Sequence, residues 1–220
     1  MSTKIHARHV GLNDLVNQFG LEMIKTPNFF PEWKSNLPDI TEDDKRTLDK
    51  IQNGYFNLVQ NPPVIEETMK LAILSPLLFA ANYFLQPLLV KTETPIRLIP
   101  DGDEEDEDEI VMEGKIDILV LKGNFWLMVI ESKRPSYSLE SGLAQMLTYM
   151  LASPNLGEGE PSYGMITNGG DFIFIKVAQT DDGPRYATSR SFALRNPGND
   201  LYPVLQILKK LAEMVLPKPA

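Results

Sequence analysis

Two acidic residues and one lysine, all next to apolar segments, are the side chains best placed for metal-dependent chemistry. Asp117 lies within the apolar segment of residues 114–121, and Glu131 and Lys133 follow the apolar run of residues 125–130. Because alternate residues of a strand share a face, Glu131 and Lys133 point the same way at the end of a buried strand. Oxygen ligands from few carboxylates, with room for water and phosphate, suit Mg²⁺. The pattern predicts a magnesium site.

The register of the predicted hairpin decides whether the two acids meet. If the turn is centred on Asn124, Asp117 lies directly opposite Glu131. Opposed side chains in an antiparallel pair have Cβ atoms about 5 Å apart, and two carboxylates so placed repel unless a cation or proton lies between them. A slip of one residue would move Asp117 to the other face of the sheet. The metal site therefore depends on this register.

Asp117, followed by Glu131-Ser132-Lys133 at the end of the next strand, resembles the core of the PD-(D/E)XK nucleases. The resemblance implies a restriction-endonuclease-like fold and a Mg²⁺ or Mn²⁺ ion held by Asp117, Glu131 and the backbone carbonyl of Ser132. It also implies that Lys133 orients or activates the attacking water. Ile116 precedes Asp117 where the family name has proline, a departure that is common in the family.

A second motif follows on the next expected helix. Gln145 and Tyr149 resemble the Q-x-x-x-Y element of RecB-type nucleases and of the N-terminal nuclease module of type I restriction motor subunits. Four residues apart, the two side chains share a helical face. The resemblance implies that they orient the metal ligands or bind the nucleic-acid backbone. Residues 164–169 resemble the threonine-asparagine-glycine hairpin of the same module, and we assign that hairpin no chemistry.

An acidic residue upstream resembles the first-helix glutamate of the same module. Glu67 shares the expected helical face of Leu71, Leu74 and Leu78, so we expect it to point inward, and Glu66 is the alternative. The resemblance implies that this glutamate completes the outer shell of the site or holds a second ion. Pro76 predicts a kink in this helix or a break into two helices.

The pattern along the chain predicts an α/β fold, a mixed central sheet flanked by helices. We expect residues 61–220 to form the nuclease domain and residues 1–60 to form a helical N-terminal extension. The expected helices span residues 12–24, 42–59, 64–85, 139–152 and 201–216, and the expected strands span residues 88–98, 110–121, 125–132, 163–167, 172–177 and, more weakly, 187–194.

Composition narrows the setting of the protein. The chain has 220 residues, no apolar run long enough for a transmembrane helix and no secretory signal, so we expect no membrane partner. It has no cysteine, which excludes disulfides and thiolate ligands and favours a cytoplasmic location. The net charge of −9 is unusual for a nucleic-acid binder, but eight acids lie in Asp101–Glu109. That stretch is either a solvated loop or a regulatory segment.

These features predict magnesium-dependent hydrolysis of phosphodiester bonds, with DNA as the expected substrate. Two other readings stay open. One is a nuclease-like scaffold that binds nucleic acid or a protein partner without cutting. The other is a protein-interaction module whose acidic stretch docks a basic partner. Cutting both strands of a duplex needs two sites, which makes a homodimer a candidate assembly.

Overall fold

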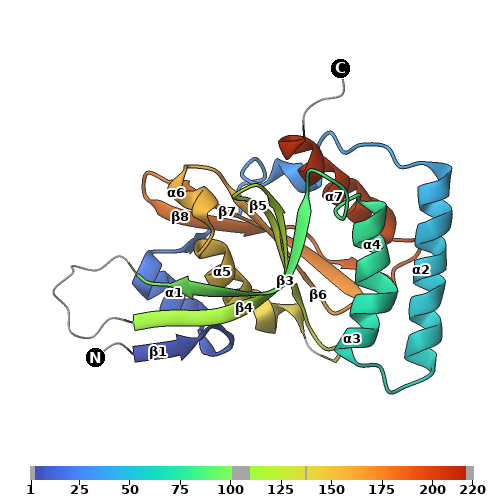
Figure 1. The fold of residues 1–220 in the computed structure, drawn as a ribbon, viewed down its shortest axis with the longest axis horizontal. Helices are drawn as coiled ribbons and strands as arrows, with labels where there is room; N and C mark the ends of the chain where they lie inside the picture. The colour runs from blue at the N-terminus through green and yellow to red at the C-terminus, as the bar shows by residue number, and fades with distance from the viewer. Residues whose placement is uncertain (1–2, 101–109, 137, 217–220) are drawn as a thin grey trace.

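A nine-stranded mixed sheet forms the centre of the molecule, with helices on both of its faces (Figure 1). The computed structural model describes residues 3–100, 110–136 and 138–216, so the acidic stretch Asp101–Glu109 lies outside the described residues. The strand order is β1-β4-β5-β6-β7-β8-β2, with β3 paired to β4 and β9 paired to β7. The predicted α/β arrangement of a mixed sheet flanked by helices is confirmed.

Most of the predicted elements occur within a few residues of their expected bounds. The strands are β1 (Thr3–His6), β2 (Glu22–Met23), β3 (Leu89–Leu98), β4 (Ile110–Lys122), β5 (Phe125–Ser132), β6 (Ser162–Thr167), β7 (Asp171–Thr180), β8 (Gly183–Thr188) and β9 (Phe192–Ala193). The helices are α1 (Leu12–Phe19), α2 (Glu42–Gln60), α3 (Glu66–Met69), α4 (Ser75–Ala80), α5 (Leu143–Leu151), α6 (Pro154–Gly157) and α7 (Leu201–Val215). Short 3-10 helices are η1 (Ala7–His9), η2 (Pro31–Trp33) and η4 (Leu139–Gly142), and η3 (Lys70–Leu74) is a π-helix.

The alternating side chains of the central strands build two hydrophobic cores. Met128 and Ile130 of β5 pack on the face covered by α2, η3, α4 and α7. Val129, between them, packs on the face covered by α1 and α5. Because side chains alternate along a strand, Glu131 emerges on the same face as Val129, beneath α5. The apolar run therefore fixes the direction of the first predicted site residue.

The β4–β5 hairpin has the predicted register beyond its turn. Ile118 lies opposite Ile130, as predicted, and just beyond this last pair of the ladder the Ser132 N–H donates to the Asp117 carboxylate, which brings Asp117 to the end of β5. The turn itself contains two residues, with Gly123 in the left-handed region at φ 60°. An irregularity close to the turn shifts the pairing by one residue. The tight turn and this irregularity together give the alignment that a turn centred on Asn124 predicts.

Residues 1–60 are not an extension outside the sheet. Besides the expected helices they supply β1, which pairs in parallel with β4, and β2, which pairs in parallel with β8. Leu48 and Ile51 of α2 lie in the same core as Val204 of α7. The predicted boundary at residue 60 thus does not separate two cores. Strands of four and two residues leave little pattern in a sequence.

The helical segment of residues 66–80 changes its winding midway. The Ser75 N–H bonds the Lys70 carbonyl, five residues back, and Pro76 follows without an N–H of its own. This wider turn shifts the buried face. Leu71, predicted to be buried, is 76% exposed, whereas Ile73 and Leu74 are buried. The predicted kink at Pro76 therefore takes the form of a π-helical turn.

No helix within the described ranges is long and apolar enough to cross a membrane.

We predict that Leu48→Ala lowers the free energy of unfolding by about 2–5 kcal/mol, because it empties a fully buried position in the core that α2 shares with the sheet. Chemical denaturation of parent and variant measures the change. Lys50→Ala, at an exposed position of the same helix, is the control and should change little. Equal stability of Leu48→Ala and the parent would show that α2 is not part of the core.

Candidate active site

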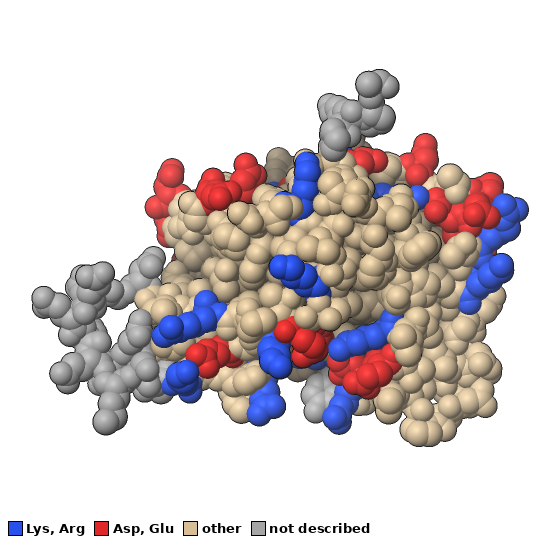
Figure 2. Space-filling model, in the orientation of Figure 1, with Lys and Arg blue, Asp and Glu red and all other residues tan. Residues whose placement is uncertain are grey.

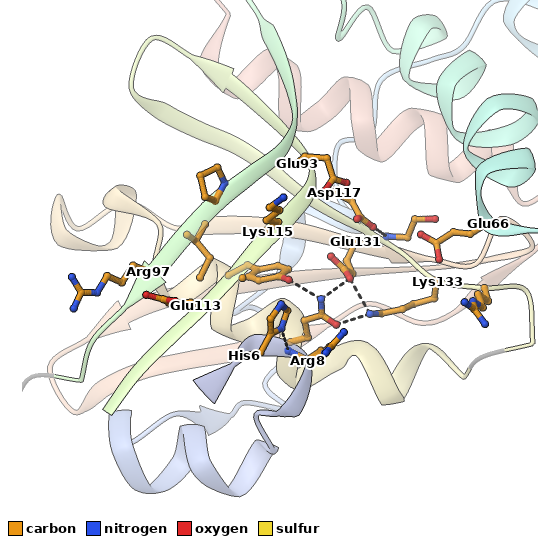
Figure 3. A pocket seen from close by; sticks show the side chains of 17 residues that line it. His6, Arg8, Glu66, Glu93, Arg97, Glu113, Lys115, Asp117, Glu131 and Lys133 are labelled. Atoms are coloured by element: carbon orange, nitrogen blue, oxygen red, sulfur yellow. Dashed lines mark hydrogen bonds and ion pairs between the residues drawn. The ribbon is translucent and has the colours of Figure 1, made fainter. Parts of the chain in front are cut away.

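A groove of about 950 Å³ contains most of the predicted site residues (Figure 3). β4 supplies Asp117, and the end of β5 supplies Glu131 and Ser132. Lys133 follows β5 directly, and α5 supplies the remaining pair, Gln145 and Tyr149, from the face above the strand ends. The groove thus brings together residues from three elements that the β4–β5 register and α5 packing hold in place.

Asp117 is fixed through one of its two oxygens. Its Oδ2 accepts a hydrogen bond of 2.8 Å from the Ser132 N–H and lies 3.5 Å from Lys70 Nζ. Within the described residues, no hydrogen bond reaches Oδ1. Ser132 is buried, and its predicted role as a metal ligand through its carbonyl stays a prediction. The carboxylate is therefore oriented while one oxygen keeps its lone pairs free.

The two carboxylate oxygens of Glu131 also differ, because one is hydrogen-bonded and the other has no partner among the described residues. Its Oε1 accepts hydrogen bonds from Lys133 Nζ at 2.9 Å and from Gln145 Nε2 at 2.8 Å. Its Oε2 is buried and has no hydrogen-bond partner among the described residues. A buried carboxylate oxygen without a partner costs stability, because it has lost its hydration and gained nothing in return. Such an oxygen fits a ligand that brings positive charge.

Gln145 connects the basic and acidic groups of the site. Its Oε1 accepts from Lys133 Nζ at 2.6 Å, and its Nε2 donates to Glu131 and, at 2.7 Å, to the Tyr149 hydroxyl. All three contacts agree with one orientation of the amide, so the side chain is locked. Tyr149 is 1% exposed and supports Gln145 from behind. Both residues are thus placed to orient the carboxylate.

Burial and nearby negative charge raise the pKa of both acids, with Asp117 acting on Glu131 and Glu66 acting on Asp117. Burial, with the nearby charge of Asp117, raises the pKa of Glu131 to about 7, although Lys133 opposes the shift. Burial also raises the pKa of Asp117, against the Ser132 N–H and the charge of Lys70. Two buried carboxylates in one groove therefore hold protons at a pH where exposed acids are ionised, unless a cation joins them.

The first-helix glutamate is one residue away from its predicted position. Glu67 is exposed and lines a neighbouring cavity, so the predicted inward orientation of Glu67 is wrong. Glu66, the alternative, lines the groove, and its Oε1 lies 2.8 Å from Lys70 Nζ. The π-helical turn explains the change, because it buries Ile73 in place of Leu71 and so rotates the face that the helix presents.

Four further basic residues line the groove, and the sequence alone assigned them no role. None has a carboxylate within ion-pair distance in the described part of the chain. They are Arg8, Arg97, Lys115 and Arg134. A signal exists for two of them: Lys115 is two residues before Asp117 on the same strand, and Arg134 follows Lys133. The other two reach the groove only through the pairing of β1 and β3 with β4.

Glu93 of β3 also lines the groove, in an unusual backbone conformation. Its φ of 51° lies in the left-handed region, which residues with a side chain seldom adopt. Its neighbours Thr92 and Thr94 pair with Ile118 and Ile116, so Glu93 stands at the level of Asp117. The edge strand thus adds a further acid to the rim of the groove (Figure 3).

No protein-family model matches this chain, and no curated protein matches its sequence. Among the described residues, no group of three or more His, Cys, Asp or Glu side chains is arranged as a ready metal cage. Mg²⁺ commonly takes one or two protein carboxylates and completes its shell with water and phosphate. The free oxygens of Asp117 and Glu131 fit that type of binding.

We predict that Glu131→Gln, without metal, raises the melting temperature at pH 8 but changes it little at pH 5. The folded pKa of about 7 exceeds the ordinary 4.5, so the parent loses stability as the pH rises through 7, whereas glutamine never ionises. A gain on the order of 1–3 kcal/mol corresponds to several degrees in a chain of this size.

Thermal melts in chelator at both pH values measure the effect. Glu158→Gln, at an exposed position, should show no such pH dependence. A Glu131→Gln shift that is the same at pH 5 and pH 8 would contradict the assigned burial of the charge.

Proposed function

We propose that this protein is a nuclease of restriction-endonuclease-like fold that uses Mg²⁺ or Mn²⁺ to hydrolyse phosphodiester bonds in DNA. The observation that carries the proposal is the unpartnered, buried Oε2 of Glu131 beside Asp117, with Lys133 fixed 2.9 Å from the other oxygen of the same glutamate. A metal ion would give this oxygen the positive partner that it lacks among residues 3–100, 110–136 and 138–216.

Asp117 and Glu131 would hold the ion, with the Ser132 carbonyl as a third protein ligand. A bound divalent ion polarises a phosphoryl oxygen and lowers the pKa of a coordinated water. The Ser132 N–H keeps Asp117 in position, and Gln145 and Lys133 keep Glu131 in position. The carboxylates therefore need no large rearrangement to receive the ion, which favours tight positioning of the substrate phosphate.

Lys133 would act on the reacting groups directly. An ammonium group has three donors and no acceptor, so it cannot ligate the metal. Two of its donors bond Glu131 and Gln145, which leaves one for water or phosphate. Placed beside the carboxylates, it can position the attacking water and stabilise the charge that grows on the phosphate oxygens. Gln145 and Tyr149 would act as positioning residues behind it.

The basic residues of the groove that form no ion pair with a carboxylate among the described residues support a polyanionic substrate. Arg97 and Lys115 lie on the same side of the two acids (Figure 3), and Arg134, which directly follows Lys133, also lines the groove. Figure 2 shows basic and acidic side chains gathered along the lower side of the molecule, over β4 and α3. Basic groups that lack carboxylate partners are free to bind phosphates, in spite of the net charge of −9.

A scaffold that binds nucleic acid or a protein partner without cutting is the second candidate, and the net charge of −9 favours it. The two candidates differ in one property, because only the first cleaves a phosphodiester bond when metal is added.

We predict that Lys133→Ala lowers the cleavage rate by about 10²–10³-fold and retains metal binding, because it removes charge from the reacting phosphate but no metal ligand. Cleavage of single- and double-stranded DNA and RNA with Mg²⁺, together with metal-induced melting shifts, measures both properties. Asp117→Asn should lose both, and Lys91→Ala, an exposed lysine of β3, should lose neither.

If Lys133→Ala cleaves DNA at a rate within a few-fold of the parent, the role proposed for Lys133 is contradicted. A parent that binds metal and cleaves none of these substrates would favour the scaffold.

We predict that Arg97→Gln and Arg134→Gln each reduce the slope of log affinity for DNA against log salt concentration by about one, because each removes about one phosphate contact. Fluorescence anisotropy of a labelled duplex over a salt series, in a Lys133→Ala background that limits cleavage, measures the slope. Lys50→Gln makes the same charge change on α2, away from the groove, and is the matched control. Equal slopes for all three variants would mean that the DNA binds elsewhere.

A further inference from the structure

We propose that the ammonium group of Lys70 takes the place of a second metal ion between Glu66 and Asp117, so that the site binds a single divalent ion. The inference rests on the proposed function, because it concerns the same carboxylates. It assigns to Lys70 a role that neither the motif at Asp117 nor the motif at Gln145 includes.

The position of Lys70 between two acids carries the inference. Its Nζ lies 2.8 Å from Glu66 Oε1 and 3.5 Å from Asp117 Oδ2. The side chains of all three residues are more than two-thirds buried, at 27%, 23% and 17% exposure. Charges held this close and partly out of water interact more strongly than an exposed surface pair. Lys70 is therefore a fixed cation of the site.

Local structure explains why Lys70 points toward β4. It lies four residues after Glu66, and side chains at this spacing share a helical face. Lys70 also begins the π-helical turn, in which its carbonyl accepts the Ser75 N–H. The wider turn presents Glu66 and Lys70 to Asp117 while Glu67 remains exposed. The π-helical turn that presents Glu66 in place of Glu67 thus also directs Lys70 toward Asp117.

The charges of the five linked side chains around Asp117 and Glu131 fit one divalent ion better than two. Three carboxylates (Glu66, Asp117 and Glu131) face two ammonium groups (Lys70 and Lys133), which leaves one negative charge. One divalent ion brings the net charge of these five side chains to +1, which suits a phosphate. A second divalent ion would bring the net charge to +3. The two oxygens of Asp117 fit a single ion, because Lys70 approaches Oδ2 and leaves Oδ1 for the metal.

Removal of Lys70 should open a second metal site. Glu66 and Asp117 would then face each other without a cation between them, and carboxylates so placed repel until a cation or a proton joins them. Asp117 could then contribute to both ions through its two oxygens. The expected change is a gain in the number of metal ions bound, which a lysine with a purely structural role would not produce.

Counting Mn²⁺ bound per chain, through the electron paramagnetic resonance signal of free Mn²⁺ in equilibrium with the full chain, tests the proposal. We expect one ion in the parent and two in Lys70→Met. Glu66→Gln added to Lys70→Met should return the count to one, and Glu67→Gln added to Lys70→Met should leave it at two. Lys115→Met, which removes a groove lysine without a carboxylate partner, should bind one ion.

Two Mn²⁺ ions in the parent, or a single ion in Lys70→Met, would overturn the role of Lys70 and leave the proposed nuclease function standing. If Lys70→Met does not fold, Lys70→Gln carries the same expectation and the same outcomes. A parent that binds no Mn²⁺ would overturn the proposed function itself, and this inference with it.

Discussion

The placement of two largely buried carboxylates, Asp117 of β4 and Glu131 of β5, in one groove is the constraint to which the surrounding side chains respond. Asp117 and Glu131 repel each other, and burial denies them the water that would screen this repulsion. The surrounding donors face these two groups: the Ser132 N–H, Lys70, Lys133 and Gln145. Each donor occupies one oxygen and spares the other. The result is an anchored pair of ligands that keeps a place for a cation.

The fold meets this constraint by using rigid elements on both sides of the pair. β5 is apolar on both faces, because helices cover each side of the sheet, so the end of this strand is firmly positioned. α5 lies over the strand ends, and its Gln145 donates a hydrogen bond to Glu131. Gly142, just before α5, passes so close to Lys133 that an added Cβ would lie 2.7 Å from its Cε. Close packing thus guides the lysine into the groove.

The sequence was most informative where apolar periodicity is long and local. The β4–β5 hairpin, its register and the helix with Gln145 could be predicted, because each depends on neighbouring residues. The choice between Glu66 and Glu67 could not be, because a single π-helical turn changes the phase of the helix. Arg8 and Arg97 could not be placed either, because they reach the groove through the pairing of β1 and β3 with β4. β1 and β4 lie about a hundred residues apart in the chain. The segment that joins β3 to β4 contains the acidic stretch, which lies outside the described residues.

In the proposed function, Asp117 and Glu131 together bind one divalent metal ion. A crystal of the protein soaked in Mn²⁺, with diffraction recorded at a wavelength where manganese scatters anomalously, tests it most directly. We expect one strong anomalous peak within ligand distance, about 2 Å, of Asp117 Oδ1 and Glu131 Oε2. If Mn²⁺ binds elsewhere in the same crystal and no peak lies near these two oxygens, Asp117 and Glu131 do not form the metal site.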